Sequence, residues 1–169
     1  GVMVGPDKTA LAWGHKDYGG LVPPDFACSI SRDIEAIYAI NDTFAALTTI
    51  NGKKRVVTWP SREGIRGFVT PPSELSSGQS SIPDVTEIVA SKCAFAAMLA
   101  NGSVVSFGWA GCGGDSSSVR NTLSSHIDSV VANDGAFAAL SSHGKAIVWG
   151  SSNHGGVLSE DTFQRLQSG

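Results

Sequence analysis

The sequence is poor in charge, in cysteine and in long apolar runs. Only 16% of its 169 residues are charged and the formal net charge is -3, so it offers no basic surface for the phosphates of nucleic acid or for an anionic membrane. No apolar run approaches the roughly 20 residues of a membrane-spanning helix. We therefore expect a soluble protein that binds no nucleic acid and does not insert into a membrane.

Motifs of catalysis and cofactor binding are also missing. The sequence contains no G-x-S-x-G, H-E-x-x-H, Walker or G-x-G-x-x-G motif. The glycine-rich stretch 108–114 lacks the lysine of a phosphate-binding loop and follows a repeated strand, so we interpret it as a corner. The four histidines are spread along the chain, and the three cysteines form no C-x-x-C pair. We expect no catalytic residue, no metal and no cofactor.

What the sequence does contain is glycine, with 20 residues, and internal repetition. A strand-like segment that ends in an aromatic residue occurs four times, at Trp13, Trp59, Phe107 and Trp149. The last three are each preceded by a Phe-Ala-Ala segment, at 43–52, 94–102 and 136–144, and by an apolar segment before it. We divide the chain as one repeat domain, 1–169, with a half unit 1–30 and units of about 31–80, 81–124 and 125–169.

Each unit is predicted to contain an antiparallel β-hairpin. Asn51–Gly52 and Asn101–Gly102 suit the positive φ angles of a two-residue hairpin turn. The strand segments alternate only imperfectly, which is typical of strands covered on both faces. The aromatic residues at the ends of the second hairpin strands are then expected to be core residues. The predicted fold class is all-β, built from tandem hairpins in a propeller-like or three-unit prism-like arrangement.

Short helical turns are expected between the units. The clearest is at 115–123, where Asp115 can accept hydrogen bonds from the first free N–H groups. Ser159 has the same place before 162–166. In the earlier units, Pro23–Pro24 and Pro71–Pro72 favour a turn with fixed φ rather than a long helix.

The hairpin register also bears on the cysteines. With Asn101 and Gly102 as the turn, Cys93 lies near Ala110, two residues short of Cys112. A bulge at the Gly111 corner would bring the two cysteines within the roughly 7 Å between Cα atoms that a disulfide allows. This possible disulfide, Cys93–Cys112, favours an oxidising, extracellular setting. Cys28 is interpreted as a small buried apolar residue.

The repeated pattern, V-x-x-I-V-A, A-F-A-A-L, N-G-x-V-V-x-W-G and then Y-G-G or C-G-G, resembles the RCC1-like repeat in its divergent bacterial and protist tandem form. The resemblance implies β-propeller blades and a binding platform, in a family that includes nucleotide-exchange factors, ubiquitin-ligase modules, a β-lactamase inhibitor and surface proteins. The chain departs from the family at Thr43, Ala94 and Ala136, where a histidine is usual.

The number of units is also lower than the four to eight blades of a typical propeller. Three explanations are open: a segment of a longer array, assembly with other copies, or a three-sheet prism. We favour a segment whose repeat ends pair or cap one another, and self-association through these ends is one of its expected contacts.

Binding is expected at the corners that follow the aromatic strands, because loops vary freely on a repeat scaffold. The candidates are the corner residues that differ between units and are common in interfaces, namely Tyr18, Arg62, Trp109 and His154. Trp109 interrupts the repeat directly after Gly108, and it either contacts a ligand or tucks beneath its own loop.

We therefore predict a non-catalytic module that binds a protein or glycan on another cell or host, as part of a larger secreted or cell-surface, adhesin-like protein. The alternatives are a cytoplasmic RCC1-type regulatory scaffold or exchange factor, and a protein inhibitor on the same frame.

Overall fold

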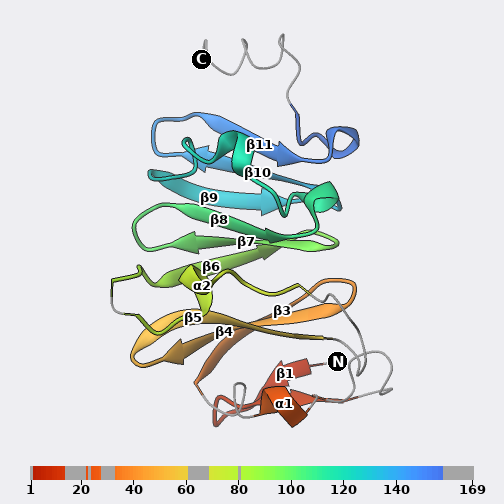
Figure 1. Cartoon of the computed structure of the whole chain (residues 1–169), viewed down its shortest axis with the longest axis vertical. Coiled ribbons are helices and arrows are strands. Elements are labelled where there is room, and N and C mark those ends of the chain that lie inside the picture. The colour runs from red at the N-terminus through yellow and green to blue at the C-terminus, as the bar shows by residue number, and fades with distance from the viewer. Residues whose placement is uncertain are drawn as a thin grey trace. The chain divides into compact units, whose positions relative to one another are not determined.

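The structure is a computed structural model that describes residues 2–13, 22, 24–27, 33–60, 69–79 and 81–157. Within these residues the fold is all-β, with one two-stranded and three three-stranded antiparallel sheets (Figure 1). The all-β repeat fold predicted from the sequence is thereby confirmed. The chain divides into two compact units, Gly1–Val85 and Thr86–Gly169, which are described in turn. Cys28 lies outside the described residues.

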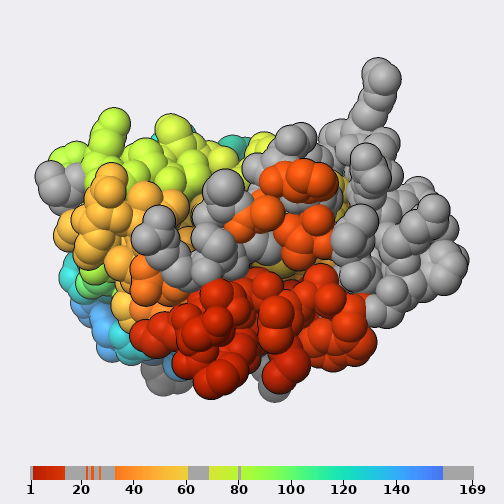
Figure 2. All heavy atoms as spheres, turned by 90° about the horizontal axis from the view of Figure 1, so that it is seen from below, coloured from red at the N-terminus to blue at the C-terminus, as the bar shows by residue number. Residues whose placement is uncertain are grey.

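Unit 1 contains a short hairpin, β1 (Val2–Val4) and β2 (Ala10–Ala12), followed by a three-stranded sheet of β3 (Ile34–Ala39), β4 (Thr43–Ile50) and β5 (Lys53–Pro60), in that order. The hairpin packs the apolar side chains of one face, among them Val2, Val4 and Ala10, onto the buried Ile34 and Trp59 of this sheet. The surface of the hairpin is seen in red in Figure 2. Unit 1 also contains two short helices, α1 (Pro24–Ala27) and α2 (Ser73–Ser76).

Unit 2 contains two three-stranded sheets. The first has the order β6 (Val85–Ala90), which begins at the end of unit 1, β7 (Ala94–Leu99) and β8 (Val104–Gly108), and the second has the order β11 (Ala146–Gly150), β10 (Ala136–Ser141) and β9 (Ile127–Ala132). They pack against one another around a common apolar core that includes Met98, Leu123, Phe137 and Trp149. Three short 3₁₀ helices lie in the loops of unit 2, η2 (Ala110–Cys112), η3 (Ser117–Val119) and η4 (Ser152–His154).

An aromatic pair joins the two strands of each main hairpin. Phe44 stacks on Trp59 and Phe137 on Trp149, with ring centroids 5.6 Å and 5.3 Å apart, and Phe95 contacts Phe107 at 5.4 Å. Such offset pairs contribute beyond their buried area. Trp59, Phe107 and Trp149 are buried, as expected for core residues. Trp13 differs: it is 53% exposed, so the expectation of a core position is wrong there.

The turns confirm one hairpin prediction and correct another. Asn51 and Gly52 have φ angles of 52° and 74° and join Ile50 to its partner Lys53, which is the predicted two-residue turn. In β7–β8, however, Met98 pairs with Val104 and the Leu99 N–H donates to Ser103 O. The loop is therefore longer, because Ala100 precedes Asn101 and only Gly102 has positive φ. An Asn-Gly pair suits both loop types.

The helical elements are short, as expected. α1 begins at Pro24 and α2 follows Pro72, where a fixed φ suits the start of a helix. The predicted turn at 115–123 is a single 3₁₀ turn at Ser117–Val119, and the Asp115 carboxylate accepts the Ser117 N–H at 2.9 Å. The prediction for Ser159 and 162–166 lies outside the described residues.

One buried arginine in unit 1 was not predicted from the sequence. The side chain of Arg55 is fully buried and donates hydrogen bonds to five backbone carbonyls, those of Lys54, Ser77, Gln79, Ile82 and Pro83. Its Nη1 also lies 3.6 Å from Asp84 Oδ1. Because a buried guanidinium requires such partners, Arg55 fixes the segment that follows α2 against β5.

Candidate functional site

Two corner loops of unit 2, Trp109–Gly114 and Ser151–Gly156, have the same backbone architecture. Each follows a glycine with positive φ and forms one 3₁₀ turn, which ends at Gly113 (φ 88°) or Gly155 (φ 81°). In the first corner the N–H groups of Cys112 and Gly114 donate to Trp109 O, and in the second those of His154 and Gly156 donate to Ser151 O. The corners are thus rigid platforms whose side chains differ.

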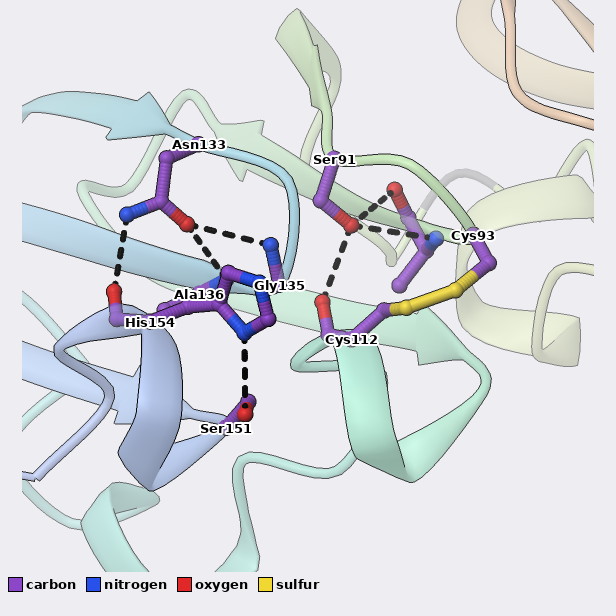
Figure 3. Close-up of a disulfide and its surroundings, with 9 residues drawn as sticks. Ser91, Cys93, Cys112, Asn133, Gly135, Ala136, Ser151 and His154 are labelled. Atoms are coloured by element: carbon purple, nitrogen blue, oxygen red, sulfur yellow. Dashed lines mark hydrogen bonds between the residues drawn. A yellow bond between two sulfur atoms is a disulfide. The ribbon is translucent and has the colours of Figure 1, made fainter.

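Each corner is fixed to the loop before its hairpin by one polar side chain (Figure 3). The Ser91 hydroxyl lies 2.9 Å from Cys112 O and accepts the Ala94 N–H. Asn133 has the equivalent role in the other corner, donating to His154 O at 2.7 Å and accepting the N–H of Ala136 at 2.9 Å.

The two corners differ in the side chains beside this polar clamp. In the first, Cys93 and Cys112 form a disulfide with their Cα atoms 5.6 Å apart. In the second, the equivalent residues are Gly135 and His154, and the imidazole ring lies where a side chain on Gly135 would point, 2.6 Å from an ideal Cβ (Figure 3). The sequence argument placed a bulge at Gly111; instead, the 3₁₀ turn brings Cys112 back to Cys93.

Trp109 is the most exposed large apolar residue of the described chain, at 69%. Its ring flanks Gly111, with three ring atoms 3.8–4.0 Å from where a Cβ would stand. The ring therefore covers its own loop on one side and presents the rest of its surface to solvent. The alternative that Trp109 tucks beneath its loop is wrong.

His154 borders a shallow hollow of about 160 Å³ on the last sheet. The hollow is lined mainly by apolar residues, among them Val131, Ala138 and Phe137, and by His154 and Gly155 at the corner. The His154 Nδ1 lies 3.1 Å from Ser151 Oγ, which holds the ring in place. Apolar walls with one oriented polar group suit a side chain or a small apolar group of a ligand.

Few charges surround the corners. Asp115 follows the first corner, and the hydrogen bonds from Ser117 keep the pKa of its carboxyl below the usual value. Lys92 and Asp134 are exposed in the loops that the clamps join, where the Lys92 N–H donates to Asp134 O. The surface is thus nearly neutral, as the composition indicated.

The structure shows two of the four predicted binding residues. Trp109 and His154 lie in equivalent corners of unit 2, and no hydrogen bond or ring contact joins them within the described residues. Tyr18 and Arg62 lie outside the described residues. The structure also brings together two histidines distant in sequence, His126 and His143, with ring centroids 5.1 Å apart.

No metal centre or membrane segment is found in the described part of the chain. None of its His, Cys, Asp and Glu side chains gather in groups of three or more that could hold a metal ion. Likewise, none of the helices in residues 2–157 that the structure describes is long and apolar enough to span a bilayer.

Solved structures of similar fold are β-propellers. One is the CRINKLY WD40 ectodomain of the Arabidopsis thaliana receptor kinase ACR4, with a TM-score of 0.54, 14% identity and coverage of 86% of this chain and 45% of that one. Another is Prp20p, the RCC1 protein of Saccharomyces cerevisiae. Its TM-score is 0.56 at 16% identity, and the match covers 88% of this chain and 42% of Prp20p. Human WBSCR16 has a TM-score of 0.52 at 16% identity, and the match covers 86% of this chain and 43% of that protein.

The fold is propeller-like. At these identities the similarity concerns the fold alone, and the chain spans less than half the length of each of these proteins. No protein-family model and no curated protein sequence matches the chain. The fold similarity to Prp20p agrees with the RCC1-like resemblance of the repeat pattern.

Proposed function

We infer that the chain is a non-catalytic binding module, the ligand- or receptor-binding part of a larger secreted or cell-surface protein of the adhesin type. The observation that carries this proposal is Trp109, which is 69% exposed on a corner closed by a disulfide. An exposed tryptophan is costly in water and is among the residues that dominate interface energies. The ligand is a protein or a glycan of another cell or host.

The rigidity of the first corner supports a binding role for Trp109. The 3₁₀ turn, the Ser91 clamp and the Cys93–Cys112 disulfide fix the backbone that follows Trp109, and the Trp109 N–H itself donates to Cys93 O. A loop whose backbone is already ordered loses little conformational entropy on binding, so more of its contact energy becomes affinity. Near-neutral surroundings suit an uncharged partner surface such as a glycan.

The disulfide also supports the extracellular setting, since such bonds persist in oxidising compartments. A receptor-kinase ectodomain shares the fold. The alternative is an intracellular RCC1-type scaffold or exchange factor, which the fold of Prp20p supports; that protein is described with binding properties to Gsp1p and histones. A protein inhibitor on the same frame would also use an exposed aromatic residue.

A glycan array tests the proposal with three proteins: the wild type, Trp109→Ala and Trp109→Phe. We expect a specific glycan signal that falls at least about tenfold in Trp109→Ala, a loss of roughly 1.4 kcal/mol or more, and is partly retained in Trp109→Phe. The exposed Thr86, on β6, gives a control variant, Thr86→Ala, that should bind normally.

Binding that is unchanged in Trp109→Ala would refute the proposed site. A silent array with all the proteins would refute the glycan ligand and direct the search to a protein partner, captured from cell-surface extracts with the same variants. Catalysis is tested separately, by incubation of captured ligand with the protein: release of a modified product would refute the non-catalytic assignment.

A further inference from the structure

Two histidines of unit 2 that are distant in the sequence lie side by side at one end of the last sheet. His126 precedes β9, and His143 lies in the turn between β10 and β11. Their ring centroids are 5.1 Å apart, with an angle of 60° between the rings, and both residues are exposed. This end of the sheet is opposite to the corner Ser151–Gly156, because β11 begins at the turn and ends at that corner.

The backbone holds both histidines in this position. The Ser142 N–H donates to His126 O at 2.9 Å, which joins the segment before β9 to the end of β10. His143 is followed by Gly144, whose φ of 77° and whose N–H bond to Ser141 O close the turn. The scaffold therefore brings the two imidazole rings together, although 17 positions separate them in the sequence.

The repeat does not need histidine at either position. In the hairpin turn, His143 stands where the earlier units have Asn51 and Asn101. At the other position, Asp33 has the role of His126 in unit 1: each has a positive φ, 56° and 62°, and each carbonyl accepts an N–H from near the end of the next strand. The fold thus forms equally with asparagine and aspartate, and it does not explain the two imidazoles.

The serine before each histidine lies beside one nitrogen of the ring. Nδ1 of His126 is 2.7 Å from Ser125 Oγ, and Nδ1 of His143 is 3.5 Å from Ser142 Oγ. When Nδ1–H donates to such an oxygen, Nε2 carries the lone pair that an ion can bind. Metal-bound histidines commonly have this arrangement, in which the second ring nitrogen donates to an oxygen that orients the ring. Both rings can therefore offer Nε2 to one ion.

The separation of the rings suits two bonds to the same metal ion. An imidazole nitrogen binds such an ion at about 2.0–2.1 Å, which puts each ring centre about 3.2 Å from the ion. With an angle of about 90–110° between the two bonds, as in square-planar and tetrahedral sites, the ring centres are about 4.5–5.2 Å apart. The 5.1 Å between His126 and His143 lies in this range.

We propose that His126 and His143 form a chelating site for a divalent ion of the late first-row transition metals, Cu²⁺, Ni²⁺ or Zn²⁺. Imidazole suits these ions, and Cu²⁺ binds most tightly among them. The pair has fewer ligands than the centres of structural and catalytic zinc, so the other positions of the ion are open to water or to a donor atom of a partner. The site does not include Trp109 and is independent of the ligand site proposed above.

Isothermal titration calorimetry of the tag-free chain with copper(II), nickel(II) and calcium chloride tests the site. We expect one Cu²⁺ or Ni²⁺ ion per chain, with Cu²⁺ the tighter, and no binding of Ca²⁺, which prefers oxygen ligands. His126→Asn and His143→Asn each remove one imidazole and are expected to weaken Cu²⁺ binding at least about tenfold. Asparagine suits both positions, since it tolerates a positive φ and stands in the other turns.

His154→Asn, which changes the opposite end of the sheet, is the control and should bind Cu²⁺ as the wild type does. Circular dichroism checks that every variant is folded. Electron paramagnetic resonance of the Cu²⁺ complex is expected to show two nitrogen ligands in the wild type, and a single nitrogen would overturn the proposal. Unchanged Cu²⁺ binding in His143→Asn would also overturn it, as would no binding in about 100-fold excess of the ion. Two ions of similar affinity per chain, of which each variant loses one, would show separate sites instead of a chelate.

Discussion

Loss of the Cys93–Cys112 disulfide is expected to destabilise unit 2 by about 3 kcal/mol. The two cysteines are 19 residues apart in the sequence, and closing a loop of this length in the unfolded chain accounts for about 3 kcal/mol in the chain-entropy description. The native backbone is expected to remain in place, because Ser91 and the 3₁₀ turn hold the corner without the disulfide.

The second corner supports this expectation from within the molecule. It has the same 3₁₀ turn and polar clamp with Gly135 and His154 in place of the cysteines. A variant with Cys93→Gly and Cys112→His reproduces this arrangement in the first corner. It should fold, with a stability loss at least as large as that of the cross-link alone, since glycine also adds freedom to the unfolded chain.

The assay is urea unfolding at 25 °C, followed by tryptophan fluorescence and far-UV circular dichroism. It compares the wild type with and without reducing agent and the double alanine variant Cys93→Ala with Cys112→Ala. The variant His154→Ala, which changes the corner that has no disulfide, is the control. A loss below about 1 kcal/mol in the reduced wild type would refute the loop-entropy reasoning. Collapse of the fold in the glycine–histidine variant would refute the equivalence of the two corners.

Two further predictions concern the scaffold. Arg55→Met is expected to reduce the free energy of unfolding by about 3–5 kcal/mol, because five backbone carbonyls lose their buried donor. The neighbouring Lys54, whose side chain is 44% exposed and pairs with Glu35, gives the control Lys54→Met, which should change the free energy of unfolding by less than about 1 kcal/mol. Equal effects of the two substitutions in a thermal unfolding assay would refute this role of Arg55. Gly113→Ala should cost more than Gly144→Ala: both have positive φ, but only the former places its Cβ within 2.5 Å of Phe137, which adds about 1–3 kcal/mol of overpacking. Comparable melting temperatures for the two alanine variants would contradict that packing argument.

The repeat made most of the fold predictable from the sequence. The Phe-Ala-Ala and aromatic strands pair with each other as expected, because the apolar segments and the glycine turns between them are local signals that recur in each unit. The register of β7 and β8 was not predictable from Asn101–Gly102, since this pair also ends a longer loop with Gly102 at positive φ. Arg55 was missed because four of its five carbonyl partners, those of Ser77, Gln79, Ile82 and Pro83, follow α2, 22 to 28 residues away, and nothing local indicates that contact.

The candidate site was predictable only as far as the units could be compared with one another. Ser91 and Asn133 hold the two corners through equivalent hydrogen bonds, and the disulfide of the first corner takes the place of the His154–Gly135 contact in the second. The structure therefore explains these residues by their role in the scaffold. Trp109 has no such explanation, since the equivalent Ser151 is small and the turn forms equally well around it. The proposed binding role of Trp109 therefore rests on two features, a large apolar ring that is 69% exposed and a rigid corner that does not need this ring.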